Sequence, residues 1–266
     1  ITKEEISKLS VKSVNEVLAY MNGVDVRQRG PFGTQADISI DGGTFEQALI
    51  LLNGIKISDP QTGHHTMNIP VALDAIERIE VLRGPMARVY GINALTGAIN
   101  IVTKSFTNNS LSVHLQSGSS FENKEEGDGK GKYWGGGAQV VGQVGNEQFH
   151  NLISFSTQKS NGQRYNSSTE DIRAYYQGAF EVNKSNSLDW SAGYIANEFG
   201  ANGYYAAPGD KESYELVKTF LAHFSTKHYI GDKFYISPRV SNRYNTDDYR
   251  YYRNDLSKAR SEHKNN

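Results

Sequence analysis

Residues 76–104, IERIEVLRGPMARVYGINALTGAINIVTK, decide how this chain is interpreted. The stretch begins as a strand, breaks at Gly84-Pro85, and then runs through Gly91 and Gly97 into a second apolar strand. A phosphate-binding loop needs G-x-x-x-x-G-K-[ST], or G-x-G-x-x-G between a strand and a helix. Neither spacing occurs here and a strand follows, so these glycines are not predicted to hold a phosphate.

The composition excludes several classes of protein. The 266 residues include 28 basic and 29 acidic side chains, so there is no electrostatic footprint for nucleic acid. The absence of cysteine excludes disulfides, thiol nucleophiles and Cys-type zinc sites. No apolar run approaches the ~20 residues of a membrane helix, and no signal peptide is visible at the start. A mean hydropathy of −0.58 with 16 tyrosines fits a soluble enzyme and also a membrane β-barrel, whose strands are apolar on one face only.

Up to about residue 106 the pattern predicts a small mixed α/β domain. SVNEVLAYM (13–21) is expected to be an amphipathic helix with a capping box formed by Ser13 and Glu16. IPVALDAI (69–76) reads as a helical turn. Four strand-like runs bounded by Gly, Asp or Pro are expected at 36–43, 48–57, 76–84 and 97–104.

After residue 106 the apolar residues recur with period two. In DIRAYYQGAFEV (171–182), Ile172, Tyr176 and Phe180 fall on one face, and Tyr175 and Gln177 on the other. Seven such strands are predicted, near 110–117, 136–144, 149–158, 171–183, 187–196, 218–229 and 233–246.

The connections between these strands alternate between short turns and long polar loops, which is typical of an outer-membrane barrel. A soluble antiparallel sheet remains the alternative. A plugged barrel has ~22 strands, so the chain is expected to be a fragment cut in a loop or one piece of a split protein. The final DYRYYRNDLSKARSEHKNN (248–266) is expected on the long-loop rim.

The 76–104 stretch resembles the plug signature of TonB-dependent outer-membrane receptors, and the resemblance covers roughly residues 10–106. It implies a mixed α/β plug domain (1–106) followed by antiparallel transmembrane β-barrel strands (107–266), about seven of roughly 22. It also implies import of a scarce bulky solute across the outer membrane of a Gram-negative bacterium, energised by the TonB complex. LNGIKISDPQTGHHTMNIP (52–70) resembles the plugs of cobalamin-type transporters, especially those that work with a surface lipoprotein.

Several residues of the signature are expected to seat the plug in the barrel. Arg83 and Arg88 can pair with wall carboxylates such as Glu181 or Asp189, while the glycines let backbone pass close to backbone. The predicted seating residues are Arg83, Gly84, Pro85, Arg88, Gly91 and Gly97.

Three plug loops, at 27–35, 41–47 and 58–68, are expected to face outward, because loops on a rigid scaffold commonly carry recognition. The predicted substrate-binding residues are Asp59, Gln61, Thr62, His64, His65 and Asn68, with Tyr204 and Tyr205 on a wall loop. A plain surface turn and an aromatic girdle are the alternatives for the plug loop and the two tyrosines. Because 58–68 holds no lysine or arginine, it favours a large, nearly neutral ligand such as a corrinoid; import of a siderophore, haem or an oligosaccharide remains open.

Neither an enzyme nor a metal protein is predicted. No nucleophile–base set is apparent, and adjacent His64 and His65 should point in opposite directions. The only cofactor indicated is Ca²⁺, weakly, through Asp247, Asp248 and Asp255 in the last loop. The expected partners are TonB, the imported ligand, a surface lipoprotein lid and outer-membrane lipid, with no nucleic acid.

Overall fold

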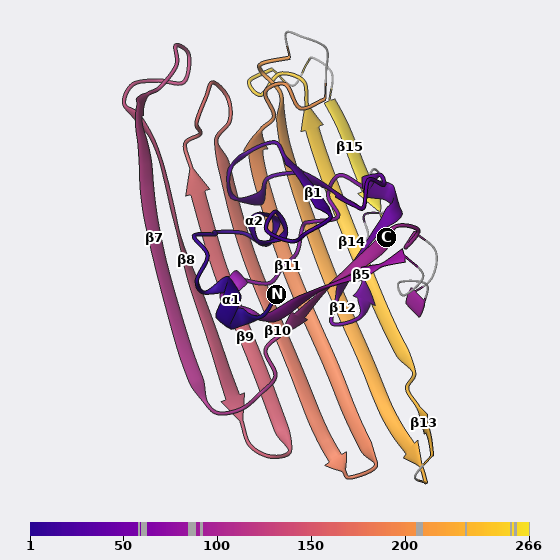
Figure 1. The fold of residues 1–266 in the computed structure, drawn as a ribbon. Helices are drawn as coiled ribbons and strands as arrows, with labels where there is room; N and C mark the ends of the chain where they lie inside the picture. The colour runs from indigo at the N-terminus through magenta and orange to yellow at the C-terminus, as the bar shows by residue number, and fades with distance from the viewer. Residues whose placement is uncertain are drawn as a thin grey trace.

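The computed structural model describes residues 1–57, 59, 63–84, 89–90, 93–205, 210–231, 233–255, 257 and 260–265. Its elements form two layers (Figure 1). The elements up to residue 103, here called the plug, lie against one face of a large antiparallel sheet, here called the wall.

The described part of the plug contains short helices and two small sheets. The helical segments are α1 (Lys3–Ile6), α2 (Val14–Leu18) and the 3-10 turns η1 (Pro31–Gly33), η2 (Phe45–Gln47) and η3 (Leu73–Ala75). Strands β1 (Val24–Gln28) and β2 (Ala36–Ile40) pair antiparallel. Strands β3 (Ala48–Leu52), β4 (Ile55–Lys56), β5 (Ile76–Arg83) and β6 (Gly97–Thr103) form a sheet in the order β4-β3-β6-β5, with β3 parallel to β6.

The predicted helix after Ser13 is confirmed, although it ends at Leu18. Ser13 Oγ accepts a hydrogen bond from the Glu16 amide at 3.3 Å, which satisfies one free donor of the first turn. The Glu16 carboxylate accepts from the Lys12 amide at 2.7 Å instead of from Ser13, so only half of the predicted capping box forms. Val17 and Leu18 are fully buried in the core of the plug.

The plug core reaches the wall. Ile50 on β3 and Ile99 on β6 are opposite each other in register and almost completely buried. The same apolar cluster includes Val141, Leu152 and Tyr175 of the wall. Burying a side chain of this size stabilises a fold by about 1.5–3 kcal/mol, so the plug and the wall share part of one core.

The described wall is a nine-stranded sheet in the order β15-β14-β12-β11-β10-β9-β8-β7, with β13 beside β12. Its strands are β7 (Ser110–Asn123), β8 (Lys132–Gly145), β9 (Phe149–Ser160), β10 (Thr169–Asn183), β11 (Asn186–Gly200), β12 (Tyr214–Ile230), β13 (Phe234–Ile236), β14 (Arg239–Arg250) and β15 (Arg260–Asn265). All pairings are antiparallel, with long connections at one end and short turns at the other (Figure 1). The edge strands β7 and β15 do not pair with each other, so the described sheet is an open part of a barrel.

The two faces of the wall have opposite polarity. The face toward the plug buries polar side chains such as Gln139, Ser154 and Gln158. The opposite face exposes Leu111 and Leu115, at 73% and 74% of their surface. This is the inverse of a water-soluble sheet and is typical of a wall that meets lipid outside and polar groups inside.

The structure corrects the number of strands. The predicted strand at 233–246 is two strands, β13 and β14, because Pro238 between them has no amide to give to the ladder. An additional strand, β15, forms where a loop was expected. Its sequence RSEHKN lacks apolar alternation, and it is held instead by backbone pairing to β14 and by the Arg260–Asp248 ion pair at 2.8 Å.

Among the described residues, no helix has the length and the apolar character needed to cross a membrane.

The apolar outer face of the wall predicts that a charged substitution there lowers stability. The loss should be largest near the middle of the bilayer and smallest near its surface. Ile153, which is 56% exposed and lies opposite Tyr176 near the middle of β10, should tolerate arginine poorly. We expect Ile153→Arg to lower the free energy of unfolding from lipid by about 2–4 kcal/mol. Val182→Arg, on the same face beside a short turn, should cost ~0–1 kcal/mol. Equal losses in urea titrations would contradict a lipid-facing surface.

Candidate ligand-binding site

The described residues of the predicted binding loop, 59 and 63–68, lie between the rest of the plug and the wall. Asp59, His65 and Asn68 are buried. The Asp59 carboxylate accepts from the His65 amide at 3.3 Å, and the Asp59 amide donates to Thr66 Oγ1 at 3.3 Å. The predicted residues Gln61 and Thr62 lie outside the described residues. Among the described substrate candidates of this loop, only His64 keeps part of its surface exposed.

His64 connects two of the loops that were expected to face outward. Its Nδ1 is 2.8 Å from Asp37 Oδ1, and Arg29 Nη2 is 2.9 Å from Asp37 Oδ2. The His64 ring also packs on Phe45, with ring centroids 4.8 Å apart. Asp37 on β2 therefore joins the loop at 27–35 to the loop at 58–68.

His65 points the other way, toward the wall. Its Nε2 is 3.0 Å from Oε1 of Glu215 on β12, and both side chains are 3% exposed. Burial by itself lowers the pKa of His65, but the hydrogen bond to Glu215 and the negative charges of Glu215, Asp247 and Asp59 raise it above its ordinary value. The two adjacent histidines thus have separate carboxylate partners.

Tyr204 and Tyr205 lie beside this loop, as the sequence indicated. Tyr204 is buried and stacks on Phe199, while Arg29 donates to its carbonyl oxygen. Tyr205 is 40% exposed, donates its hydroxyl to Glu215, and has its ring centroid 6.2 Å from that of His64. Among the described candidates, Tyr205 and His64 therefore remain accessible together.

Sequence reasoning did not identify Arg29, Asp37 and Glu215 as site residues, although they hold this cluster together. Arg29 lies in a loop that was expected to face outward, so its neighbourhood was indicated. Glu215 gave no local signal, because it belongs to a strand 150 residues from His65.

A pocket of about 600 Å³ lies next to this cluster, between residues 28–32 of the plug and strands β7 to β9. Its lining includes Lys12, Gln28, Arg29, Phe32, Trp134 and Gln163. The described substrate candidates do not line it, but the loop at 27–35 does. Pockets of this size are typical of small-molecule sites.

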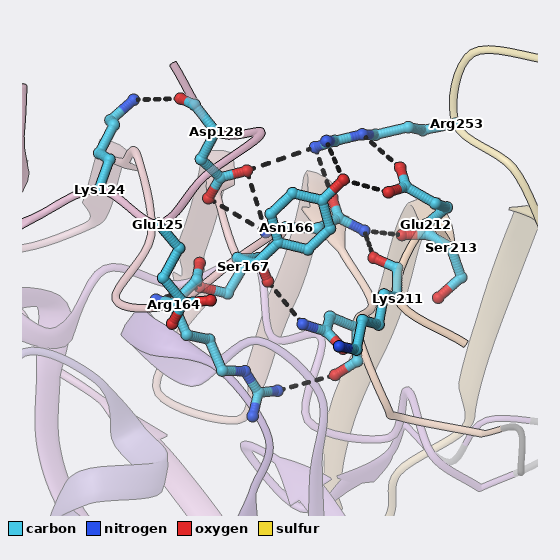
Figure 2. Close-up of polar contacts among 12 residues, drawn as sticks. Lys124, Glu125, Asp128, Arg164, Asn166, Ser167, Lys211, Glu212, Ser213 and Arg253 are labelled. Atoms are coloured by element: carbon cyan, nitrogen blue, oxygen red, sulfur yellow. Dashed lines mark hydrogen bonds and ion pairs between the residues drawn. The ribbon is translucent and has the colours of Figure 1, made fainter. Parts of the chain in front are cut away.

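The long loops above this pocket are tied together by polar contacts (Figure 2). Arg253, after β14, lies 3.2 Å from a Glu212 carboxylate oxygen, donates to Asn166 Oδ1 at 2.9 Å, and lies 3.8 Å from Asp128. Asn166 donates its side-chain amide to the carbonyl of Ser213 at 2.7 Å. Four loops, one from each long connection of the described wall, thereby share one network.

Among the described seating residues, Arg83 has other partners than the expected wall carboxylates. Arg83 does not pair with Glu181 or Asp189; it donates to the carbonyl of Asn22 and lies 3.5 Å from Asp41, both within the plug. Arg83 ends β5, at an edge of the plug sheet, which explains its plug partners. Pro85, Arg88 and Gly91 lie outside the described residues.

Glycine is required at positions 84 and 97 for two different structural reasons. Gly84 has φ +53°, in the left-handed region where a side chain is strained. A Cβ on Gly97 would lie 2.4 Å from the carbonyl oxygen of Leu82, so backbone does pass close to backbone at this position.

Several neutral hydrogen bonds also join the described plug to the wall. Asn53 donates to Gln177 Oε1 at 3.1 Å, and Thr103 donates to the same oxygen at 2.6 Å. Farther along, the Ala72 amide donates to Ser154 Oγ at 3.1 Å. Inward polar residues of the wall strands thus contact the plug at more than one place.

The three aspartates that suggested Ca²⁺ are not brought together. Asp248 pairs with Arg250 and Arg260, each at 2.8 Å, and Asp255 accepts from Ser257. Asp247 points to the opposite face, toward the plug, where it joins the surroundings of His65.

A compact plug seated on the polar face of a wall with an apolar outer surface defines the class of plugged β-barrel receptors. Residues 1–98 match the family model of the TonB-dependent receptor plug domain. The curated relatives include a vitamin B12 transporter BtuB of Vibrio vulnificus, 29% identical over 77% of this chain and 33% of the relative. Another, the BtuB of Photobacterium profundum, is 32% identical over 61% of this chain and 25% of the relative.

Solved structures show the same fold. The ferric citrate transporter FecA in its unliganded form superposes with a TM-score of 0.75 at 15% identity, over 94% of this chain and 39% of FecA. The siderophore receptor PirA of Acinetobacter baumannii gives a TM-score of 0.62 at 21% identity, over 94% of this chain and 39% of PirA. Residues 1–98 therefore match the plug domain of TonB-dependent receptors, and the chain shares its fold with solved receptors of this kind. It spans a third or less of the length of these two curated relatives.

The ion pairs of Asp37 predict a measurable loss when its charge is removed. Asp37→Asn removes the carboxylate that Arg29 and His64 share, so we expect the plug to lose about 1–3 kcal/mol of stability. The matched control is Asp25→Asn, which removes an exposed pair with Arg27 and should cost ~0–1 kcal/mol. Native-state hydrogen exchange of the β1–β2 amides measures both, and equal effects would rule out a special role for Asp37.

The close approach at Gly97 predicts a steric penalty. Gly97→Ala should destabilise the plug by about 1–3 kcal/mol, because the new methyl group meets the carbonyl of Leu82. Gly118→Ala on β7 has open space around its Cβ and should change stability by less than about 0.5 kcal/mol. Thermal unfolding of both variants checks the contrast, and a neutral Gly97→Ala would contradict it.

Proposed function

We propose that this chain is part of a TonB-dependent transporter of the Gram-negative outer membrane that imports a corrinoid. The sequence similarity to vitamin B12 transporters carries this proposal. The polarity of the wall supports the membrane location, because its outer face exposes aliphatic side chains and its inner face holds the plug. The inner-membrane TonB complex is the proposed energy source, a surface lipoprotein lid is a proposed partner, and no catalytic role is assigned.

The charges near the proposed site favour a large ligand with little net charge. The guanidinium of Arg29 is already paired with Asp37, and the adjacent His64 shares that carboxylate. A trianionic iron chelate requires a cluster of unpaired basic groups. The described pocket offers Lys12 and Arg29 together with amides and aromatic rings, which suits polar recognition of a bulky neutral molecule.

Calorimetry on the intact receptor in detergent tests the substrate. We expect cyanocobalamin to bind, and a panel of ferric siderophores and haem to bind at least 100-fold more weakly. Gln163→Ala, on the exposed rim of the pocket, should weaken cyanocobalamin binding several-fold. Gln148→Ala, exposed at the opposite end of the wall, is the control and should have no effect. Tight chelate binding without corrinoid binding would reject the substrate and leave the transporter class intact.

Extraction behaviour tests the transporter class separately. The intact receptor should require detergent for release from membranes, whereas a soluble β-rich binding protein would not. Uptake of radiolabelled cyanocobalamin by cells should also depend on TonB. Detergent-free extraction of a folded, ligand-binding protein would overturn the proposal as a whole.

A further inference from the structure

Three potential metal ligands meet where the plug touches the wall. They are His65 Nε2 from the plug loop, a carboxylate oxygen of Glu215 on β12, and one of Asp247 on β14. These atoms all lie within 4.8 Å of one another, and the three residues are 2–5% exposed. Three separate segments of the chain thus place one nitrogen and two oxygen donors around a single point.

The charges at this point favour a cation. Asp59 is also buried here, accepting from the His65 amide, so three carboxylates converge on the loop. The guanidinium of Arg243, which donates to the carbonyls of Ile57 and His65, supplies a single fixed positive charge. Burying unbalanced negative charge is costly. A divalent ion balances the remaining two carboxylates, whereas a proton on His65 balances only one.

The surroundings orient these donors as an outer shell orients metal ligands. Glu215 uses its second carboxylate oxygen to accept from the Tyr205 hydroxyl, which leaves Oε1 directed at His65. Gln35 donates to the same hydroxyl at 2.7 Å, and its Oε1 is buried with no hydrogen-bond partner within the described residues. His263 Nδ1 lies 3.7 Å from the Asp247 carboxylate and offers a further nitrogen.

We propose that His65, Glu215 and Asp247 bind a divalent transition-metal ion, Zn²⁺ by ligand type, that links the plug to β12 and β14. One imidazole with two carboxylates is a donor set for Zn²⁺. It has too few oxygens for Ca²⁺, which takes six to eight. The sequence did not predict this transition-metal site, because Glu215 and Asp247 are remote from His65 along the chain and belong to ordinary strand patterns; Asp247 was considered only as a Ca²⁺ ligand.

Titration of the chelator-treated intact receptor with Zn²⁺ tests the proposal, with Co²⁺ absorption as a report on the ligands. We expect one Zn²⁺ per receptor and a rise in the melting temperature that Ca²⁺ does not reproduce. Asp247→Asn keeps the side-chain shape and should weaken Zn²⁺ binding at least tenfold. His65→Gln should do the same and alter the visible spectrum of bound Co²⁺.

Asp248→Asn is the matched control, because Asp248 is adjacent in sequence but faces away and pairs with Arg250 and Arg260. Its Zn²⁺ affinity should stay within twofold of the unmodified receptor. Absence of stoichiometric Zn²⁺ binding to the unmodified receptor, or equal affinities in all three variants, would overturn the proposal. These measurements use no corrinoid, so their outcome is independent of the proposed substrate.

Discussion

The polar inner face of the wall is the constraint on which the rest of the structure depends. Because the outer face is apolar, many polar side chains of the wall, such as Gln139, Ser154 and Gln158, point inward and need partners there. The plug provides them through groups such as the Asn53 amide, which reaches Gln177, and the Ala72 amide, which reaches Ser154. Each such bond contributes only about 0.5–1.5 kcal/mol. Many individually weak neutral contacts therefore add to the charged contacts of His65 and Arg243 in holding the plug against the wall.

Much of the fold could be predicted because its signals are local. Period-two alternation located the strands from β7 to β12, and the run of glycines and aliphatic residues located β5 and β6. The errors occurred where local signals disappear. Strand β15 has no apolar alternation and exists through its pairing with β14, while Pro238 divides a strand whose side-chain pattern looked continuous.

The sequence indicated which residues lie at the site, but it did not indicate the partners to which they bond. The polar loop at 58–68 and Tyr205 do meet, and the two histidines diverge as neighbouring residues should. Their partners could not be deduced. Asp37 and Glu215 are single acidic residues in strands, and nothing near them in the sequence distinguishes them from other strand carboxylates. The partner of Arg83 could not be deduced either. A basic residue beside a turn can pair with any of several acidic residues, and Arg83 pairs with Asp41.

The network around Arg253 restricts the motion of the long loops at the outer rim. Loops joined through Asn166, Glu212 and Asp128 lose their independent motion when the protein folds rather than when a ligand arrives. A molecule approaching the rim then meets a preorganised surface, so less conformational entropy is lost on association. The same contacts couple distant parts of the rim: a substitution that displaces Arg253 removes contacts to Asp128, beside β7, as well as to Glu212, before β12.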